Sequence, residues 1–221
     1  MHAATIDAAT WWARPRGAQS AAWIANYKNS LTSRHRDGIS AIVGSLGVTS
    51  VLEVGCHCGP NLIRLATDHP SLEQLSGVDV SAEAISAGNA WAQSAGLSER
   101  VQMVPGRIPD ASSMLADRCV DVVLSCYALA YIAPPDLDAV LSEMGRLARV
   151  AVILAEPMSD GSTDPKISFT GYSEWAHNYA AASRWINTWR GMTLTTRDVT
   201  PPVDRLSAIL VATRGDTQNT L

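Results

Sequence analysis

The chain has 221 residues, of which 47% are hydrophobic and 17% are charged. This composition is that of one globular domain with a sizeable core, and it excludes a disordered chain. The formal net charge of −4 argues against a broadly basic nucleic-acid binder.

Compartment and membrane contact also follow from composition. No apolar run approaches the ~20 residues that a membrane-spanning helix needs, and residues 1–12 hold no apolar secretory segment. Four cysteines in a chain of this length do not form a disulfide framework. We therefore expect reduced thiols, a cytoplasmic location and no contact with a membrane.

Short β-branched runs alternate with helical patterns through the middle of the chain. Apolar residues spaced i, i+3, i+4, i+7 predict a helix over 39–46, and the run SVLEV predicts a strand over 50–54. The alternation continues with helices expected at 60–66, 81–96, 112–117 and 134–148 and strands at 75–80, 101–104, 121–125 and 151–156. Strands that alternate with helices predict a doubly wound α/β fold with a parallel sheet.

The C-terminal part has a different pattern. We expect a helix over 173–186 and two strands over 193–199 and 206–213, joined by a link at Pro201 and Pro202. Such a link predicts an antiparallel pair at the edge of the sheet. The single domain of residues 1–221 is thus expected to comprise an N-terminal helical lid (1–37), a core (38–156), an insertion (157–191) and a terminal strand pair (192–214).

The sequence VLEVGCHCG at residues 51–59 is typical of a strand, a glycine turn and the start of a helix. Ligands of open α/β sheets bind at the carboxyl ends of the strands, so this turn is the expected site. His57 and Pro60 stand where a dinucleotide-binding motif needs its second and third glycines. A ligand with a ribose but no diphosphate fits better, and Asp79 at the end of the next strand is placed to accept the ribose hydroxyls.

Four segments in order, VLEVGCHCG, GVDVS, VQMVPGRIP and DVVLSCYALAYI, resemble the successive motifs of class I S-adenosylmethionine-dependent methyltransferases. The resemblance covers roughly residues 38–156. It implies a mostly parallel seven-stranded sheet with a reversed last strand and helices on both faces. It also implies S-adenosylmethionine as the cofactor, S-adenosylhomocysteine as its product and methyl transfer as the reaction.

The resemblance assigns cofactor-binding residues as well. It places the first motif near the methionine part, Asp79 at the ribose and the segment after the third strand along the adenine. The residues that it implies are Glu53, Gly55, Cys56, Gly59, Asp79, Val80, Gly106, Arg107, Ile108, Ser125 and Cys126. His57 replaces the middle glycine of the common motif, and Arg107 stands where many members have an acidic residue. Recognition of the adenine is therefore expected to use backbone groups.

Metal binding is an alternative for some of these residues. The pair Cys56 and Cys58 is too close for the usual spacing of a zinc site. Glu156, Asp160 and Asp164 are spaced too loosely to predict a site for a divalent cation. We expect no metal.

Large aromatic residues gather in the two segments that flank the core. They are Trp11, Trp12, Trp23, Trp175, Trp185 and Trp189, with Tyr27, Phe169, Tyr172 and Tyr179. We expect them to cover the carboxyl edge of the sheet as a lid and acceptor pocket, and an ordinary packing core or a homodimer interface is an equal alternative. The expected acceptor-binding residues are Trp23, Tyr27, Tyr131, Tyr172 and Trp175.

The candidate catalytic residues are His35, His177 and Tyr127. The two histidines lie in the flanking segments, where either is a candidate general base. A base is optional, because a sulfonium is already an activated leaving group and positioning supplies much of the acceleration. Cys126 is expected to form a pocket wall rather than a nucleophile, since Ser125 replaces the proline of the Pro-Cys pair in carbon-5 pyrimidine methyltransferases.

We therefore expect methyl transfer to an oxygen or nitrogen of a small-molecule acceptor, by in-line displacement in a lidded pocket. Two alternatives stay open. One is an RNA or nucleotide methyltransferase, which the total charge does not favour, using residues 11–36 with their five Arg or Lys and no acid. The other is a non-catalytic methyltransferase-like subunit that contacts a partner through its aromatic flanks.

Overall fold

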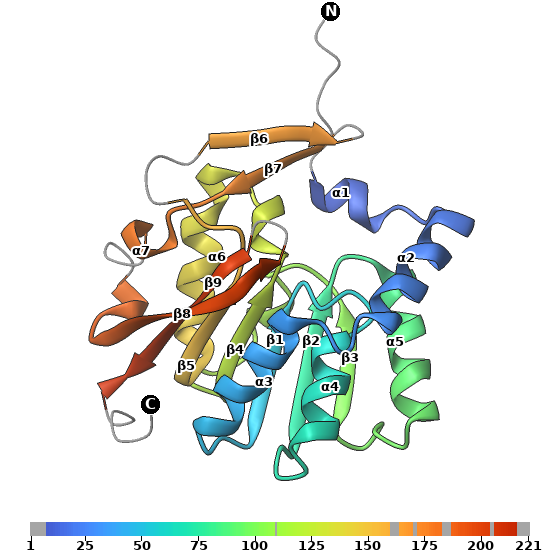
Figure 1. The fold of residues 1–221 in the computed structure, drawn as a ribbon, viewed down its shortest axis with the longest axis horizontal. Coiled ribbons are helices and arrows are strands. Elements are labelled where there is room, and N and C mark those ends of the chain that lie inside the picture. The colour runs from blue at the N-terminus through green and yellow to red at the C-terminus, as the bar shows by residue number, and fades with distance from the viewer. Residues whose placement is uncertain are drawn as a thin grey trace, which may run out of the picture.

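The computed structural model describes residues 8–108, 110–159, 164–169, 172–182, 187–203 and 206–215. Within these residues seven strands form one sheet in the order β3-β2-β1-β4-β5-β9-β8 (Figure 1). Their bounds are Ser50–Val54 (β1), Gln74–Asp79 (β2), Val101–Pro105 (β3), Val120–Cys126 (β4), Ala148–Ala155 (β5), Met192–Val203 (β8) and Leu206–Arg214 (β9). The first five strands pair in parallel, whereas β9 is antiparallel to β5 and to β8. The predicted mostly parallel sheet with a reversed last strand is confirmed.

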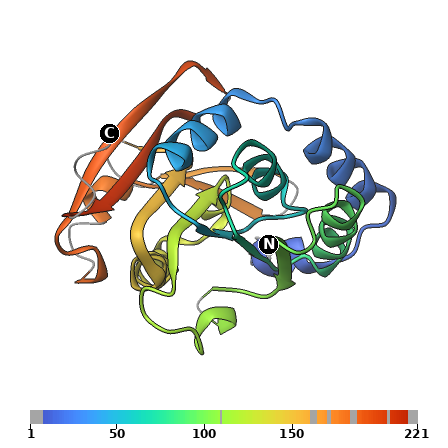
Figure 2. The same cartoon turned by 90° about the horizontal axis from the view of Figure 1, so that it is seen from below.

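Helices cover both faces of this sheet (Figure 2). They are α3 (Arg34–Ser45), α4 (Pro60–Asp68) and α5 (Ala82–Ser94) on one face and α6 (Pro134–Leu147) on the other. Leu62 of α4 belongs to one buried core cluster, and Leu141 of α6 belongs to a second. Val122 of β4 belongs to the first cluster and Val123 to the second, because successive side chains of a strand point to opposite faces of the sheet.

Two further units lie at the carboxyl ends of the parallel strands (Figure 1). The first comprises α1 (Ala8–Ala13) and α2 (Ala18–Asn29). The second is a two-stranded antiparallel sheet of β6 (Asp164–Phe169) and β7 (Tyr172–Ala176). α1 contacts β7, and α2 contacts α5, so both units are docked on the core.

The segment after β7 contains α7 (Tyr179–Ala182) and a 3-10 turn at Asn187–Trp189. The expected helix over 173–186 is therefore wrong at its start, where β7 pairs with β6. A partner strand outside the window of the helical pattern decides this conformation. Asp160, Trp185 and the side chains of Phe169 and Tyr172 lie outside the described residues.

Two other expected elements differ from the structure. The expected helix over 112–117 is replaced by a 3-10 turn at Asp110–Ser112, because Arg146 binds the carbonyl oxygens of Ser112 and Leu115. The expected link at Pro201 and Pro202 is part of β8, which is an edge strand and therefore tolerates proline. Within the described residues, no helix has both the length and the apolar character to cross a bilayer.

Candidate active site

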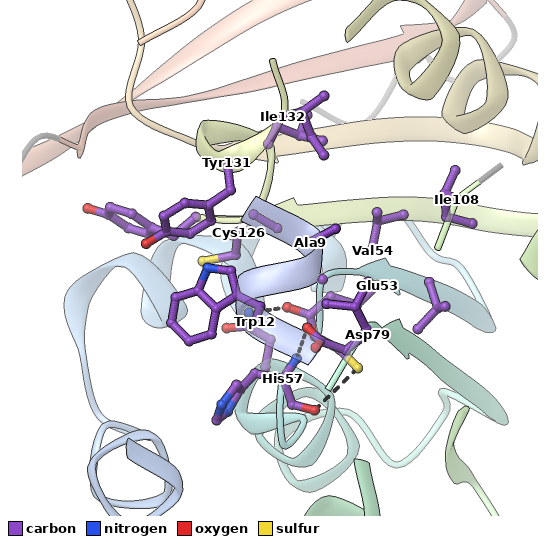
Figure 3. Close-up of a pocket in the computed structure, with 18 of the residues that line it drawn as sticks. Ala9, Trp12, Glu53, Val54, His57, Asp79, Ile108, Cys126, Tyr131 and Ile132 are labelled. Carbon is purple, nitrogen blue, oxygen red and sulfur yellow. Dashed lines mark hydrogen bonds between the residues drawn. The ribbon is translucent and has the colours of Figure 1, made fainter. Parts of the chain in front are cut away.

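A cavity of about 820 Å³ lies at the carboxyl ends of β1, β2 and β4 and is also lined by residues of α1 and α2 (Figure 3). The expected cofactor-binding residues that line it are Glu53, Gly55, Cys56, Asp79, Val80, Gly106, Arg107, Ile108 and Cys126. The expected acceptor-side and catalytic residues that line it are Trp23, Tyr27, His35, Tyr127 and Tyr131. One cavity thus brings both groups together.

The turn after β1 has a backbone conformation that requires glycine at one position. Gly55 has φ of +71°, and a Cβ there would lie 2.2 Å from the Cβ of Ala128. Only glycine fits such a position. His57 has φ of +50°, and its N–H donates to the carboxylate of Asp79 at 2.9 Å. The turn therefore presents backbone and a carboxylate to the cavity.

Asp79 ends β2 and connects two elements of the site. Its second carboxylate oxygen accepts from the backbone N–H of Ser81 at 2.8 Å. Burial raises the pKa of Asp79, and the two N–H groups oppose that effect. The backbone N–H of Gly106 donates to the carbonyl oxygen of Asp79 at 2.9 Å, so the segment that follows β3 is fixed beside it.

Glu53 is a buried carboxylate at the floor of the cavity. Its Oε1 accepts from the amide of Asn61, and the amide oxygen of Asn61 accepts from the guanidinium of Arg36. Arg36 is itself buried and also donates to the carbonyl oxygen of Ser30 at 3.0 Å. Burial raises the pKa of Glu53 to about 8. Its Oε2 is buried with no hydrogen-bond partner, so the site has a carboxylate oxygen that a bound cationic group would satisfy.

We expect Glu53 to make stability depend on pH. The pKa of this carboxyl is about 8 in the folded state and near its ordinary 4.5 in the unfolded state. Above pH ~4.5 the unfolded chain releases a proton that the folded chain keeps, so stability falls as the pH rises towards 8 and then levels off. Glu53→Gln should remove this part of the slope. Urea unfolding at pH 5.5 and 8.5 measures it.

The comparison between wild type and Glu53→Gln isolates this group. Burial also raises the pKa values of Asp79 and Glu156 and lowers those of His57 and His177, and these contributions are common to both proteins. If the free energy of unfolding fell equally from pH 5.5 to pH 8.5 in wild type and in Glu53→Gln, the assignment to Glu53 would be contradicted.

The segment after β4 forms another wall. Tyr127 has φ of +56°, and its N–H donates to the carbonyl oxygen of Ala155 at 3.1 Å. Burial raises the pKa of the Cys126 thiol to about 12, so this thiol stays protonated and does not offer a thiolate nucleophile. The rings of His35 and Tyr127 lie 5.8 Å apart between centroids.

Four of the expected site residues that the structure describes do not line the cavity. Gly59 begins α4, with φ of +72°, and Ser125 is fully buried in β4. His177 is fully buried, and its Nε2 lies 3.0 Å from the carbonyl oxygen of Ile132. Trp175 stacks on His177 with 6.4 Å between ring centroids. The side chain of Tyr172 lies outside the described part of the structure.

Glu156, at the end of β5, holds the 3-10 turn Leu129–Tyr131. Its Oε1 accepts from the hydroxyl of Ser125 at 2.7 Å and from the backbone N–H of Ala128 and Leu129 at 2.9 and 3.1 Å. Its Oε2 accepts from Ala130 at 3.3 Å. The carboxylate is thus engaged by backbone and hydroxyl donors. Across the described part of the chain, no three His, Cys, Asp or Glu side chains gather where they could hold a metal ion.

Sequence reasoning did not select several residues that line the cavity. They include Trp12 of α1, Arg36 of α3, Asn61 of α4, Ile132, and Val140 of α6. In the sequence, Trp12 is only one of many aromatic residues in the flanking segments. Arg36 was visible only as part of a basic stretch, and Val140 carried the ordinary pattern of a core helix.

Comparisons with known proteins agree with this geometry. Residues 51–150 match the family model described as a methyltransferase domain. The magnesium protoporphyrin IX methyltransferase of Synechocystis PCC 6803, solved with S-adenosylhomocysteine, has a TM-score of 0.62 at 18% identity, over 91% of this chain and 89% of that one. No curated protein sequence matches the chain.

Two structures from Burkholderia thailandensis are also similar. Its 1,6-didemethyltoxoflavin-N1-methyltransferase has a TM-score of 0.62 at 17% identity, over 91% of this chain and 92% of that one. An O-methyltransferase family protein has a TM-score of 0.67 at 17% identity, over 89% of this chain and 58% of that one. These likenesses concern the fold.

The strand order, the glycine turn and the carboxylate that ends β2 define a class I, Rossmann-like methyltransferase fold. Residues 51–150 match a methyltransferase domain, for which S-adenosylmethionine is the expected cofactor. The residues present fit this cofactor. Asp79 suits a ribose, the partnerless oxygen of Glu53 suits an ammonium group, and Arg36 in the same cavity suits a carboxylate.

Proposed function

We propose that the protein transfers a methyl group from S-adenosylmethionine to an oxygen or nitrogen of a small molecule held in the cavity. The observation that carries this is the lid. Trp12 of α1 and Tyr27 of α2 line the same cavity as Glu53 and Asp79. A cavity bounded in this way suits a small acceptor better than a polymer. The porphyrin and toxoflavin methyltransferases of similar fold support the choice.

Under this proposal the residues have distinct roles. S-adenosylmethionine supplies a methyl group on sulfur, whose bond electrons stay with the sulfur when the acceptor lone pair takes the methyl group. Asp79 accepts hydrogen bonds from the ribose hydroxyls. Glu53 holds the ammonium group of the methionine part, and Arg36 holds its carboxylate. Positioning and exclusion of water by the lid are the main contributions of the chain.

A proton must leave the acceptor when it is a hydroxyl or an amine with hydrogen. His35 lines the cavity beside Tyr127 and is the candidate to accept it. Burial raises the pKa of Tyr27 to about 12, so this phenol stays a hydrogen-bond donor. His177 has no place in the lining, and we assign it to holding Ile132 rather than to proton transfer.

The RNA alternative has less support, because the basic stretch does not form one exposed face. Arg36 is buried, and the guanidinium of Arg16 lies 3.6 Å from the ring centroid of Trp11. Lys28 lies 5.4 Å from the ring centroid of Trp91. Arg14 and Arg34 are exposed. Three of the five basic side chains therefore make separate contacts within the protein. The two that remain exposed do not form the continuous basic surface that binding of a phosphate backbone needs.

The test is transfer of radiolabelled methyl from S-adenosylmethionine to fractionated cell extract. We expect label in the small-molecule fraction and none above background in RNA. Label in RNA that disappears as salt is raised would support the RNA alternative instead. Absence of S-adenosylhomocysteine binding by calorimetry would favour the non-catalytic subunit.

A further inference from the structure

The cavity has two parts of different chemistry. Glu53 and Asp79 give the part at β1 and β2 its carboxyl groups, and another part is lined by Trp12, Tyr131 and Ile132. Its volume of about 820 Å³ is close to the upper limit of ordinary ligand pockets, which span about 300–1,000 Å³. A cofactor in the first part therefore leaves the second part for another molecule.

Three rings pack against one another and line one side of the cavity, and we call them the aromatic slot: Trp12, Trp23 and Tyr131. The ring of Trp12 lies 5.1 Å from Trp23 and 5.5 Å from Tyr131 between centroids, and the planes are inclined by 46° and 60°. Figure 3 shows Trp12 between Tyr131 and His57. The centroids of Trp12 and His57 are 6.3 Å apart, so the aromatic slot begins beside the cofactor turn.

The ring of Trp12 is held in place by its own neighbours. Trp11 is buried and meets Trp12 edge to face, with 4.9 Å between centroids. Arg16 stacks on Trp11 and donates a hydrogen bond to its carbonyl oxygen. Such contacts fix a rigid ring before a ligand arrives, which lowers the entropy cost of binding.

The wall near the aromatic slot is apolar. Ile132 follows Tyr131, lines the cavity and packs against the core cluster beneath α6 (Figure 3). Val140 of α6 lines the cavity as well and is itself buried. Rigid aromatic faces near aliphatic side chains favour a flat, apolar ligand, because a bulky saturated one of equal size loses ring contact.

The charges around the cavity disfavour an anionic acceptor. Asp110 and Asp136 line it, and no lysine does within the described lining. Of its two arginines, Arg36 is hydrogen-bonded to Asn61 and Ser30 at the Glu53 end. Arg107 follows β3 in the same short segment as the oppositely charged Asp110. An anionic group at the aromatic slot would therefore meet acidic side chains without a dedicated cation.

We propose that the acceptor is a flat aromatic molecule without an anionic substituent, and that Trp12 of the aromatic slot selects it. This inference rests on the proposed function, since it names the class of molecule that the same cavity takes. It assigns the specificity to α1, which lies outside the residues 51–150 that match the family model.

Ligand-observed NMR titration on protein saturated with S-adenosylhomocysteine tests this with three probes. The probes are 1-naphthol, which is flat and neutral, decahydro-1-naphthol, which is saturated, and 1-naphthoate, which is flat and anionic. We expect 1-naphthol to bind about tenfold more tightly than either of the others, because the saturated probe loses ring contact and the anionic probe meets acidic side chains. Equal binding of the three probes would overturn the proposal.

Variants connect the preference to Trp12. Trp12→Ala should lose the tenfold preference for the flat probe, and Trp12→Phe should keep most of it. Trp91→Ala is the matched control, because Trp91 contacts Lys28 and does not line the cavity. Circular dichroism checks the fold of each variant. An unchanged preference in folded Trp12→Ala contradicts the inference, whereas failure of wild type to bind S-adenosylhomocysteine contradicts the proposed function instead.

Discussion

Replacing Asp79 with alanine is expected to weaken the binding of S-adenosylhomocysteine by at least ~1.5 kcal/mol, which is more than tenfold. The carboxylate of Asp79 lines the cavity and is placed to accept ribose hydroxyls, and hydrogen bonds to a charged group are the stronger kind. The variant also removes the acceptor for the N–H groups of His57 and Ser81, so the turn loses its anchor. Isothermal titration calorimetry measures the change.

Two further variants sharpen this prediction. Asp79→Asn retains one carbonyl oxygen and should give an intermediate loss of affinity. Asp138→Ala removes the same charge from an exposed position of α6 and should leave affinity unchanged. Unaltered affinity in a folded Asp79→Ala variant would remove the ribose role from this residue.

Replacing Glu156 with alanine is expected to lower the free energy of unfolding by about 3 kcal/mol or more. The carboxylate is fully buried and accepts from three backbone N–H groups and from the hydroxyl of Ser125. Truncation leaves these four donors without acceptors, and each unsatisfied buried donor costs about 1–3 kcal/mol before water or relaxation offsets part of the loss. Urea unfolding followed by circular dichroism measures this.

Glu156→Gln should be less harmful, because the amide keeps one acceptor oxygen in the same shape. Glu99→Ala, at an exposed position, should change stability by less than about 0.5 kcal/mol. A Glu156→Ala variant as stable as Glu99→Ala would show that the 3-10 turn at Leu129–Tyr131 is held by other contacts. Since Tyr131 belongs to the aromatic slot, we also expect Glu156→Ala to weaken binding of 1-naphthol.

Much of the core was predictable because its signals are local. The strand, turn and helix at residues 51–68 follow from contiguous residues, since Gly55 alone tolerates the approach of Ala128 and Pro60 suits the first turn of α4. The position of Asp79 follows from the next strand in the same way. β1, β4 and most of β5 are buried on both faces, so their apolar runs are continuous and easy to find.

The errors have a common physical cause. β7 adopts a strand because β6 pairs with it, and the segment 112–117 lacks a helix because Arg146 binds its carbonyl oxygens. Arg36 is buried because Asn61 and Ser30 satisfy its guanidinium, although Arg34, two residues earlier, is exposed. In each case the deciding partner lies outside the local pattern.

The amino-acid sequence by itself determined the doubly wound sheet and the glycine turn, because short stretches of chain with required backbone conformations define both. The expected cofactor came from the resemblance of four such stretches to methyltransferase motifs. The tertiary structure alone decided which flanking residues face the acceptor. Trp12 and Tyr131 are far apart in the chain, but their rings contact each other at the cavity. His177 does not line the cavity and instead contacts the carbonyl oxygen of Ile132. Their positions depend on how α1, the loop after β4 and the β6–β7 sheet pack together, and that packing is not encoded in any one segment.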